Sequence, residues 1–145
     1  MTGRFKKFVS IIISLMVVCS AFGVYASANN SYKSPYNFVL PTNGEYRFTA
    51  PRPKNDSSLV YVKLNTGSNA GTYFRAFGTQ YTSSPYYEVD LSYNTLLLYP
   101  GQEGYIYQNI YDAGYYYAIL GGRNGGTTTY SVSGEWSPDS DRYYW

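Results

Sequence analysis

The stretch YIYQNIYDAGYYYAILG, residues 105–121, indicates the fold class of this chain. Tyrosine and isoleucine, both strong strand formers, lead up to Asp112-Ala113-Gly114 and resume directly after it. A three-residue connection that ends in glycine is typical of a β-hairpin, with the glycine in the left-handed backbone region. The stretch therefore predicts two antiparallel strands, Tyr105–Tyr111 and Tyr115–Leu120.

This hairpin would fix which side chains share a face, because successive residues of a strand point to opposite sides of a sheet. We expect the aliphatic residues on one face, namely Ile106, Ile110, Ala118 and Leu120. We expect tyrosines on the other face, namely Tyr105, Tyr107, Tyr111, Tyr115 and Tyr117. A buried tyrosine hydroxyl needs a hydrogen-bond partner and an isoleucine does not, so the aliphatic face is the better core candidate.

The tyrosine face would then be exposed, and contiguous exposed aromatic residues often mark a binding surface. We predict that Tyr107 and Tyr117 are exposed and that Ile106, Ile110 and Leu120 are buried. The alternative is that tyrosine simply tolerates half-burial in strands, and that this face packs against a second sheet or a loop.

The same alternation of strand formers and turn residues extends over most of the chain. Further strands are expected at Tyr36–Leu40, Glu45–Thr49, Leu59–Leu64, Thr72–Phe77, Tyr86–Leu91, Thr95–Tyr99 and Thr127–Trp136. No segment after residue 28 has helical apolar spacing together with a cap and a stop. Eight or nine short strands without helices predict an all-β fold of two packed antiparallel sheets, a jelly-roll-like β-sandwich, with a small barrel as the alternative.

The N-terminal segment has the three parts of a secretory signal peptide. A basic start with Arg4 precedes the apolar run Phe8–Val24, and Ala26-Ser27-Ala28 supplies small residues at a cleavage site. We expect residues 1–28 to be removed and the protein to be secreted. The alternatives are a retained membrane anchor and a lipid attached to Cys19.

Without this segment the chain has a different charge. Residues 1–28 contain three of the eleven basic residues and none of the nine acidic ones, so residues 29–145 have a formal net charge of −1. A basic surface for nucleic acid is therefore not expected.

Cys19 is the only cysteine, so residues 29–145 cannot form a disulfide. We expect a polar lead at 29–35, one β-sandwich domain at 36–137 and an aromatic tail at 138–145.

The residue types of common catalytic and metal sites are largely missing. The chain has no histidine, which is the commonest general base and zinc ligand. Glu88 and Asp90 would share a strand face, so a glycosidase remains an alternative, although such a pair is usually a solvated face. Asp139-Ser140-Asp141 lacks the further ligands of a calcium loop and is expected to be a polar tail. We predict no enzyme activity and no cofactor.

Two resemblances bear on function. The segment Thr129–Trp136, TYSVSGEW, and the residues Ser137-Pro138-Asp139 after it resemble a family of short, secreted Gram-positive bacterial proteins classed as a domain of unknown function. This resemblance implies export and a sandwich fold. The ending Tyr143-Tyr144-Trp145 is similar to that of lactococcin-type bacteriocins, which are small secreted β-sandwiches.

These observations lead to two functional hypotheses. The first is a secreted, non-enzymatic binding domain that acts at the cell envelope or on neighbouring cells, in a bacteriocin-like way. Its partner would be a cell-wall glycan, a membrane interface or a protein surface. The second is a carbohydrate-binding module in which tyrosines stack on sugars while Gln108 or Asn109 forms hydrogen bonds. The binding residues would be Tyr105, Tyr107, Tyr111, Tyr115, Tyr117, Tyr143, Tyr144 and Trp145.

Overall fold

The runs of aromatic and aliphatic residues form ten strands in the computed structural model, which describes residues 29–143. The strands are β1 (Ser34–Leu40), β2 (Arg47–Phe48), β3 (Arg52–Pro53), β4 (Val60–Thr66), β5 (Thr72–Thr79), β6 (Val89–Asp90), β7 (Leu96–Leu98), β8 (Glu103–Ile106), β9 (Tyr117–Asn124) and β10 (Tyr130–Ser137). Residues 29–143 contain no helix that could cross a membrane.

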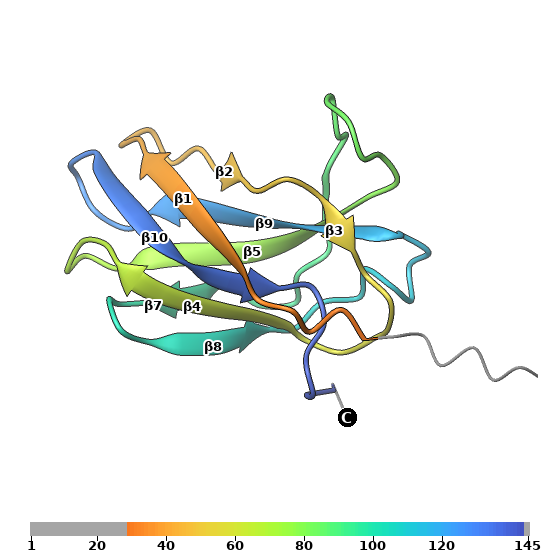
Figure 1. Ribbon diagram of the computed structural model, residues 1–145. Coiled ribbons are helices and arrows are strands. Elements are labelled where there is room, and N and C mark those ends of the chain that lie inside the picture. Colours follow the sequence, from red (N-terminus) through yellow and green to blue (C-terminus); the bar gives the residue numbers. More distant parts are fainter. Residues whose placement is uncertain (1–28, 144–145) are drawn as a thin grey trace, which may run out of the picture.

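The strands make two antiparallel sheets that pack face to face (Figure 1). The first sheet has the order β1-β10-β4-β8. In the second sheet, β2 and β3 pair with one edge of β9, β5 pairs with the other edge, and β6 and β7 pair with β5. The chain changes sheet in most of its connections, as in a jelly roll. The predicted all-β sandwich is confirmed.

The core lies between the two sheets and follows the period-2 pattern of the strands. In β1, Tyr36, Phe38 and Leu40 are buried whereas Asn37 and Val39 are exposed. The other strands of both sheets and the connection after β8 complete the core with Val60, Val62, Leu64, Phe74, Ala76, Leu98, Ile106, Ile110, Ala118, Leu120, Val132 and Trp136. Because 29–143 hold no cysteine, packing of this kind must supply most of the stability of the sandwich.

The predicted hairpin at 105–121 is wrong, although its turn is correct. Gly114 has a φ of +82°, in the left-handed region. However, β8 pairs with β4 in the first sheet, and β9 pairs with β5 in the second. Residues 107–116 therefore cross from one sheet to the other. A tight turn determines the local chain direction only, and in a jelly roll consecutive strands usually belong to different sheets.

The predicted burial of the aliphatic residues is confirmed, since Ile106, Ile110, Ala118 and Leu120 are all buried. The tyrosines divide into two groups. Tyr107 is exposed, as predicted, and Tyr111 is exposed too, but Tyr105, Tyr115 and Tyr117 are half-buried. The prediction for Tyr117 is therefore wrong. This residue lies in β9, where Pro53 of β3 pairs alongside it, and it lines a hollow together with Lys54 and Tyr111.

The segment Leu91–Asn94 bridges the two sheets along one edge. The Ala76 amide of β5 donates to Ser92 Oγ at 2.6 Å. On the other side, the Tyr93 amide donates to the Tyr107 carbonyl at 2.7 Å, and the Asn109 amide donates to the Leu91 carbonyl at 3.1 Å. This edge of the sandwich is thus closed by hydrogen bonds to the Ser92 side chain and between backbone groups, which hold Tyr93 beside the connection between β8 and β9.

Two other segments differ from the sequence-based expectation. The strand expected at Tyr86–Leu91 is reduced to β6, because Tyr87 has a φ of +47°, outside the range of an extended strand. Pro138–Ser140 is buried rather than a polar tail, since the chain after β10 folds back and the Leu59 amide donates to the Arg142 carbonyl at 2.7 Å. The expected signal peptide, Tyr144 and Trp145 lie outside the described residues.

Candidate functional site

Two irregular segments meet at one end of the sandwich, on the right in Figure 1. They are the loop between β3 and β4 and the connection 107–116 between β8 and β9. Buried Gln108 ties them together, because its Nε2 donates to the Ser58 carbonyl at 2.7 Å and its Oε1 accepts from the Ile110 amide at 2.6 Å. The Lys54 amide also donates to the Tyr116 carbonyl at 2.9 Å. The backbone at this end is therefore well fixed.

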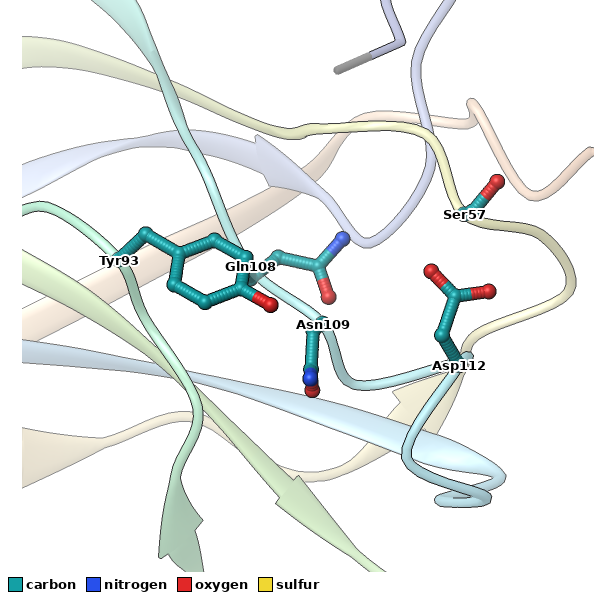
Figure 2. Close-up of a pocket in the computed structure, with 5 residues that line it drawn as sticks. All are labelled: Ser57, Tyr93, Gln108, Asn109 and Asp112. Carbon is teal, nitrogen blue, oxygen red and sulfur yellow. The ribbon is translucent and has the colours of Figure 1, made fainter. Parts of the chain in front are cut away.

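A hollow of about 460 Å³ lies between these segments and the Leu91–Asn94 bridge. We call it the amide hollow. It is lined by Ser57, Tyr93, Gln108, Asn109 and Asp112. Figure 2 shows the Tyr93 ring on one side, Ser57 and Asp112 on the other, and the two amide side chains between them. A flat aromatic ring thus faces a mixed set of hydroxyl, amide and carboxylate groups.

Asn109 is the most unusual residue of the amide hollow. Its side-chain Oδ1 is buried, and it has no hydrogen-bond partner among residues 29–143. A buried acceptor without a partner costs about 1–3 kcal/mol, so proteins rarely retain one. A bound molecule that brings an N–H or O–H donor into the hollow would remove this cost. Tyr93, 63% exposed, offers an adjacent apolar surface.

A second hollow, of about 490 Å³, shares the same two segments. We call it the tyrosine groove. It is lined by Pro53, Lys54, Asn55, Tyr111, Tyr116 and Tyr117. Tyr111 and Asp112 are neighbours in the chain, and each lines one of the two hollows. The amide hollow and the tyrosine groove therefore flank one connection and together make up the candidate surface.

A third hollow, of about 390 Å³, contains Tyr105 and is less suited to a ligand. The Tyr105 ring packs edge-on against Tyr61, with 5.6 Å between ring centroids, and the Arg142 guanidinium lies 4.6 Å from the ring centroid. Tyr61 donates from its hydroxyl to Glu103 Oε2 at 2.6 Å. Burial is the largest cause that raises the pKa of Tyr61, and the hydrogen bond to Glu103 raises it further. The side chains around Tyr105 therefore already contact one another.

The carboxylates considered for catalysis lie on the surface. Glu88 and Asp90 are exposed, as expected for a solvated face. Asp90 Oδ2 lies 3.1 Å from Arg75 Nε, so the Asp90 carboxylate forms an ion pair with Arg75. Among residues 29–143, no three His, Cys, Asp or Glu side chains gather in a way that could hold a metal ion.

The sequence matches a family model over residues 22–140, which is most of the chain. The chain belongs to DUF2712. The description of this family is "protein of unknown function", which agrees with the resemblance to a domain of unknown function. No curated protein and no solved structure matches the chain.

In this DUF2712 protein, the tyrosines expected on one patch occupy several environments. Tyr111 and Tyr117 line the tyrosine groove, Tyr107 is exposed on the connection, and Tyr105 lies on the first sheet. Tyr115 is half-buried and packs against the core. Tyr143 is exposed and donates from its hydroxyl to Asp56 Oδ2 at 3.3 Å. The single five-tyrosine face is therefore wrong, because its two strands lie in different sheets.

Sequence reasoning missed seven residues that line the two hollows, namely Pro53, Lys54, Asn55, Ser57, Tyr93, Asp112 and Tyr116. Tyr116 stands within the tyrosine run 115–117, but the expected register assigned it to the core face. Tyr93 is exposed in the Leu91–Asn94 bridge, and no local pattern predicts that this segment lies beside Gln108. The contact depends on the sheet topology.

Proposed function

We propose that this protein is an exported, non-enzymatic binding domain of a Gram-positive bacterium, and that it binds a glycan of the cell envelope. The ligand would occupy the amide hollow and extend over the tyrosine groove. Export is supported by the basic, apolar and small-residue parts of residues 1–28. The choice of a glycan is supported by the chemistry of the two hollows.

Sugar rings have two chemically distinct surfaces. Their C–H faces are apolar and stack on aromatic rings, while their hydroxyl groups need both donors and acceptors. The amide hollow combines Tyr93 with two amides, a hydroxyl and a carboxylate. The tyrosine groove adds Tyr111 and Tyr116, both exposed. Rings and polar groups thus both line the two hollows, and a chain of sugar units offers partners to both kinds of group.

The buried Asn109 Oδ1 is the observation that carries the proposal. A sugar hydroxyl in the amide hollow would donate to this oxygen after a rotation of the Asn109 side chain that exposes it, and would supply the missing hydrogen bond. Neighbouring Gln108 is held by its hydrogen bonds with Ser58 and Ile110, so it fixes the connection that carries Asn109. A site fixed in this way loses little conformational entropy on binding.

Co-sedimentation of the purified protein with insoluble cell walls and polysaccharides tests the proposal. Tyr93→Ala and Asn109→Ala should each weaken binding about three- to tenfold, because a ring contact or a hydrogen bond contributes about 1 kcal/mol. Tyr99→Ala and Asn37→Ala are matched controls, since both residues are exposed and line neither hollow. Failure of the wild-type protein to sediment with any glycan would overturn the proposal.

Export has its own test. The form recovered from the culture medium should begin at Asn29, which peptide mass mapping of the N-terminus can establish. A protein that stays with the cells and retains residues 1–28 would contradict export.

A bacteriocin-like action on neighbouring cells is the second form of the proposal, and exposed Tyr143 near the aromatic ending supports it. In this form, binding to an envelope component of a related strain would inhibit its growth. Purified protein should then inhibit some members of a panel of Gram-positive strains, and Tyr143→Ala should reduce the effect. Normal growth of every strain would leave the glycan-binding role only.

A further inference from the structure

A cluster of three charged residues, two of them fully buried and the third half-buried, adjoins the tyrosine groove. Lys54 and Asp139 both have fully buried side chains, and Lys54 Nζ lies 2.6 Å from Asp139 Oδ1. Asp56 Oδ1 lies 3.7 Å from the same nitrogen. Lys54 belongs to the loop after β3, and Asp139 lies two residues after β10. The contact therefore joins two segments that are far apart in the sequence.

The two oxygens of Asp139 have different surroundings. Oδ2 accepts two backbone N–H groups, from Asn30 at 2.8 Å and from Asn55 at 3.1 Å. Oδ1 faces the Lys54 amine. Two N–H donors on one carboxyl oxygen are the arrangement that stabilises the oxyanion formed when a nucleophile attacks the carboxyl carbon. The nucleophile in position here is the nitrogen of Lys54.

The surroundings of Lys54 favour the reactive form of its amine. Burial lowers the pKa of Lys54, and the contacts with Asp139 and then Asp56 partly offset this effect. A buried lysine of this kind can serve as a nucleophile, as it does in enzymes that form covalent lysine intermediates. Its Nζ also donates to the Ser58 carbonyl at 2.7 Å, which orients it within the cluster.

We propose that Lys54 and Asp139 join through an intramolecular amide bond between Nζ and the side-chain carboxyl carbon Cγ. The bond forms autocatalytically once the sandwich has folded and has brought the two side chains into contact.

The reaction is a condensation that needs no oxidant or other reactant. A proton passes from the Lys54 ammonium to Asp139, which gives a neutral amine and a carboxylic acid. The nitrogen lone pair attacks Cγ, and the oxyanion develops on Oδ2, between the amides of Asn30 and Asn55. Asp56 accepts a proton from the attacking nitrogen and returns it to Oδ1. The bond from Cγ to Oδ1 then breaks, and Oδ1 leaves as water.

Such a bond would have a clear structural role. Residues 29–143 contain no cysteine, so a disulfide cannot link the loop after β3 to the segment after β10. An amide between Lys54 and Asp139 would close this connection covalently, and a covalent closure of a long loop restricts the unfolded chain as a disulfide does. It would also fix Asn55, which lines the tyrosine groove.

Intact mass spectrometry of the full-length chain, under denaturing conditions, tests the proposal. The measured mass of the wild-type protein should be lower, by one water molecule, than the mass calculated from its sequence between the observed termini. Tryptic mapping should find Lys54 uncleaved and its peptide joined to the peptide that contains Asp139. A wild-type mass without this loss, or a loss that maps to other residues, would overturn the proposal even if every variant failed to fold.

Variants identify the reacting groups. Lys54→Arg preserves the charge but removes the amine nucleophile, so the water loss should disappear. Lys63→Arg, on β4 and outside the cluster, is the matched control and should retain it. Asp56→Asn should lower the crosslinked fraction at a fixed time after synthesis. A fraction equal to wild type would contradict the proton-transfer role of Asp56.

Discussion

Ile110→Ala tests the inference that the connection between β8 and β9 is anchored in the core while it presents its polar and aromatic residues outward. Ile110 is fully buried and belongs to the main core cluster. Its amide donates to Gln108 Oε1, and its carbonyl accepts from the Tyr115 amide. Alanine keeps these backbone bonds and removes only the buried side-chain carbons, so the substitution isolates the packing.

The expected loss of stability follows from the three carbons that are removed. At about 0.8 kcal/mol for each buried carbon, the transfer term is about 2.4 kcal/mol. The cavity left behind adds to this, within the range of about 2–5 kcal/mol measured for such substitutions. Because whole domains are stable by only about 5–15 kcal/mol, the change should be large but compatible with folding.

Urea unfolding followed by tyrosine and tryptophan fluorescence measures the effect. Tyr107→Ala is the control on the same connection. Tyr107 is exposed, so the control should alter the free energy of unfolding by about 1 kcal/mol or less. A mild effect of Ile110→Ala together with unfolding by Tyr107→Ala would refute the assigned orientation of the connection.

Three further predictions concern the rest of the fold. Asp139→Ala should destabilise the protein by about 3–5 kcal/mol in urea unfolding, because Lys54 would stay buried without its partner, whereas Asp141→Ala, an exposed site, should change little. Gly134→Ala should cost about 1–3 kcal/mol or more in a thermal melt, because the new Cβ would lie 1.9 Å from the Lys63 carbonyl oxygen; a melt equal to wild type would contradict the close packing of β10 and β4. Burial raises the pKa of Tyr36. The free energy of unfolding should therefore fall as the pH rises above about 10, where tyrosine ionises in the unfolded chain. Tyr36→Phe should flatten this pH dependence.

The sequence was sufficient for the all-β class, for most of the strands and for the core residues of the segment 105–121. Alternation along β1 predicts its buried and exposed residues, because a strand with one face in a core must alternate. The need of a buried phenol for a partner correctly places Ile106, Ile110 and Leu120 inside. Gly114 was also recognisable as a left-handed turn residue.

The candidate site was predictable only in part, because it depends on contacts between distant segments. A turn at Gly114 does not reveal whether the next strand joins the same sheet, and here it joins the other one. The contacts of Gln108 with Ser58 and of the Tyr93 amide with Tyr107 arise from the jelly-roll order. Asp139 appeared to belong to a polar tail, because nothing in its neighbourhood shows that Lys54 lies beside it.

The proposed function requires that an envelope glycan binds at the end of the sandwich that carries the amide hollow and the tyrosine groove. The most direct measurement is an NMR titration of the isotope-labelled protein with soluble cell-wall glycan fragments. We expect the largest shifts at the amides of Ser57, Asn109 and Asp112, and we expect Asn109→Ala to reduce them. The absence of shifts, or shifts confined to the opposite end around Asn43 and Gly44, would contradict the proposed function.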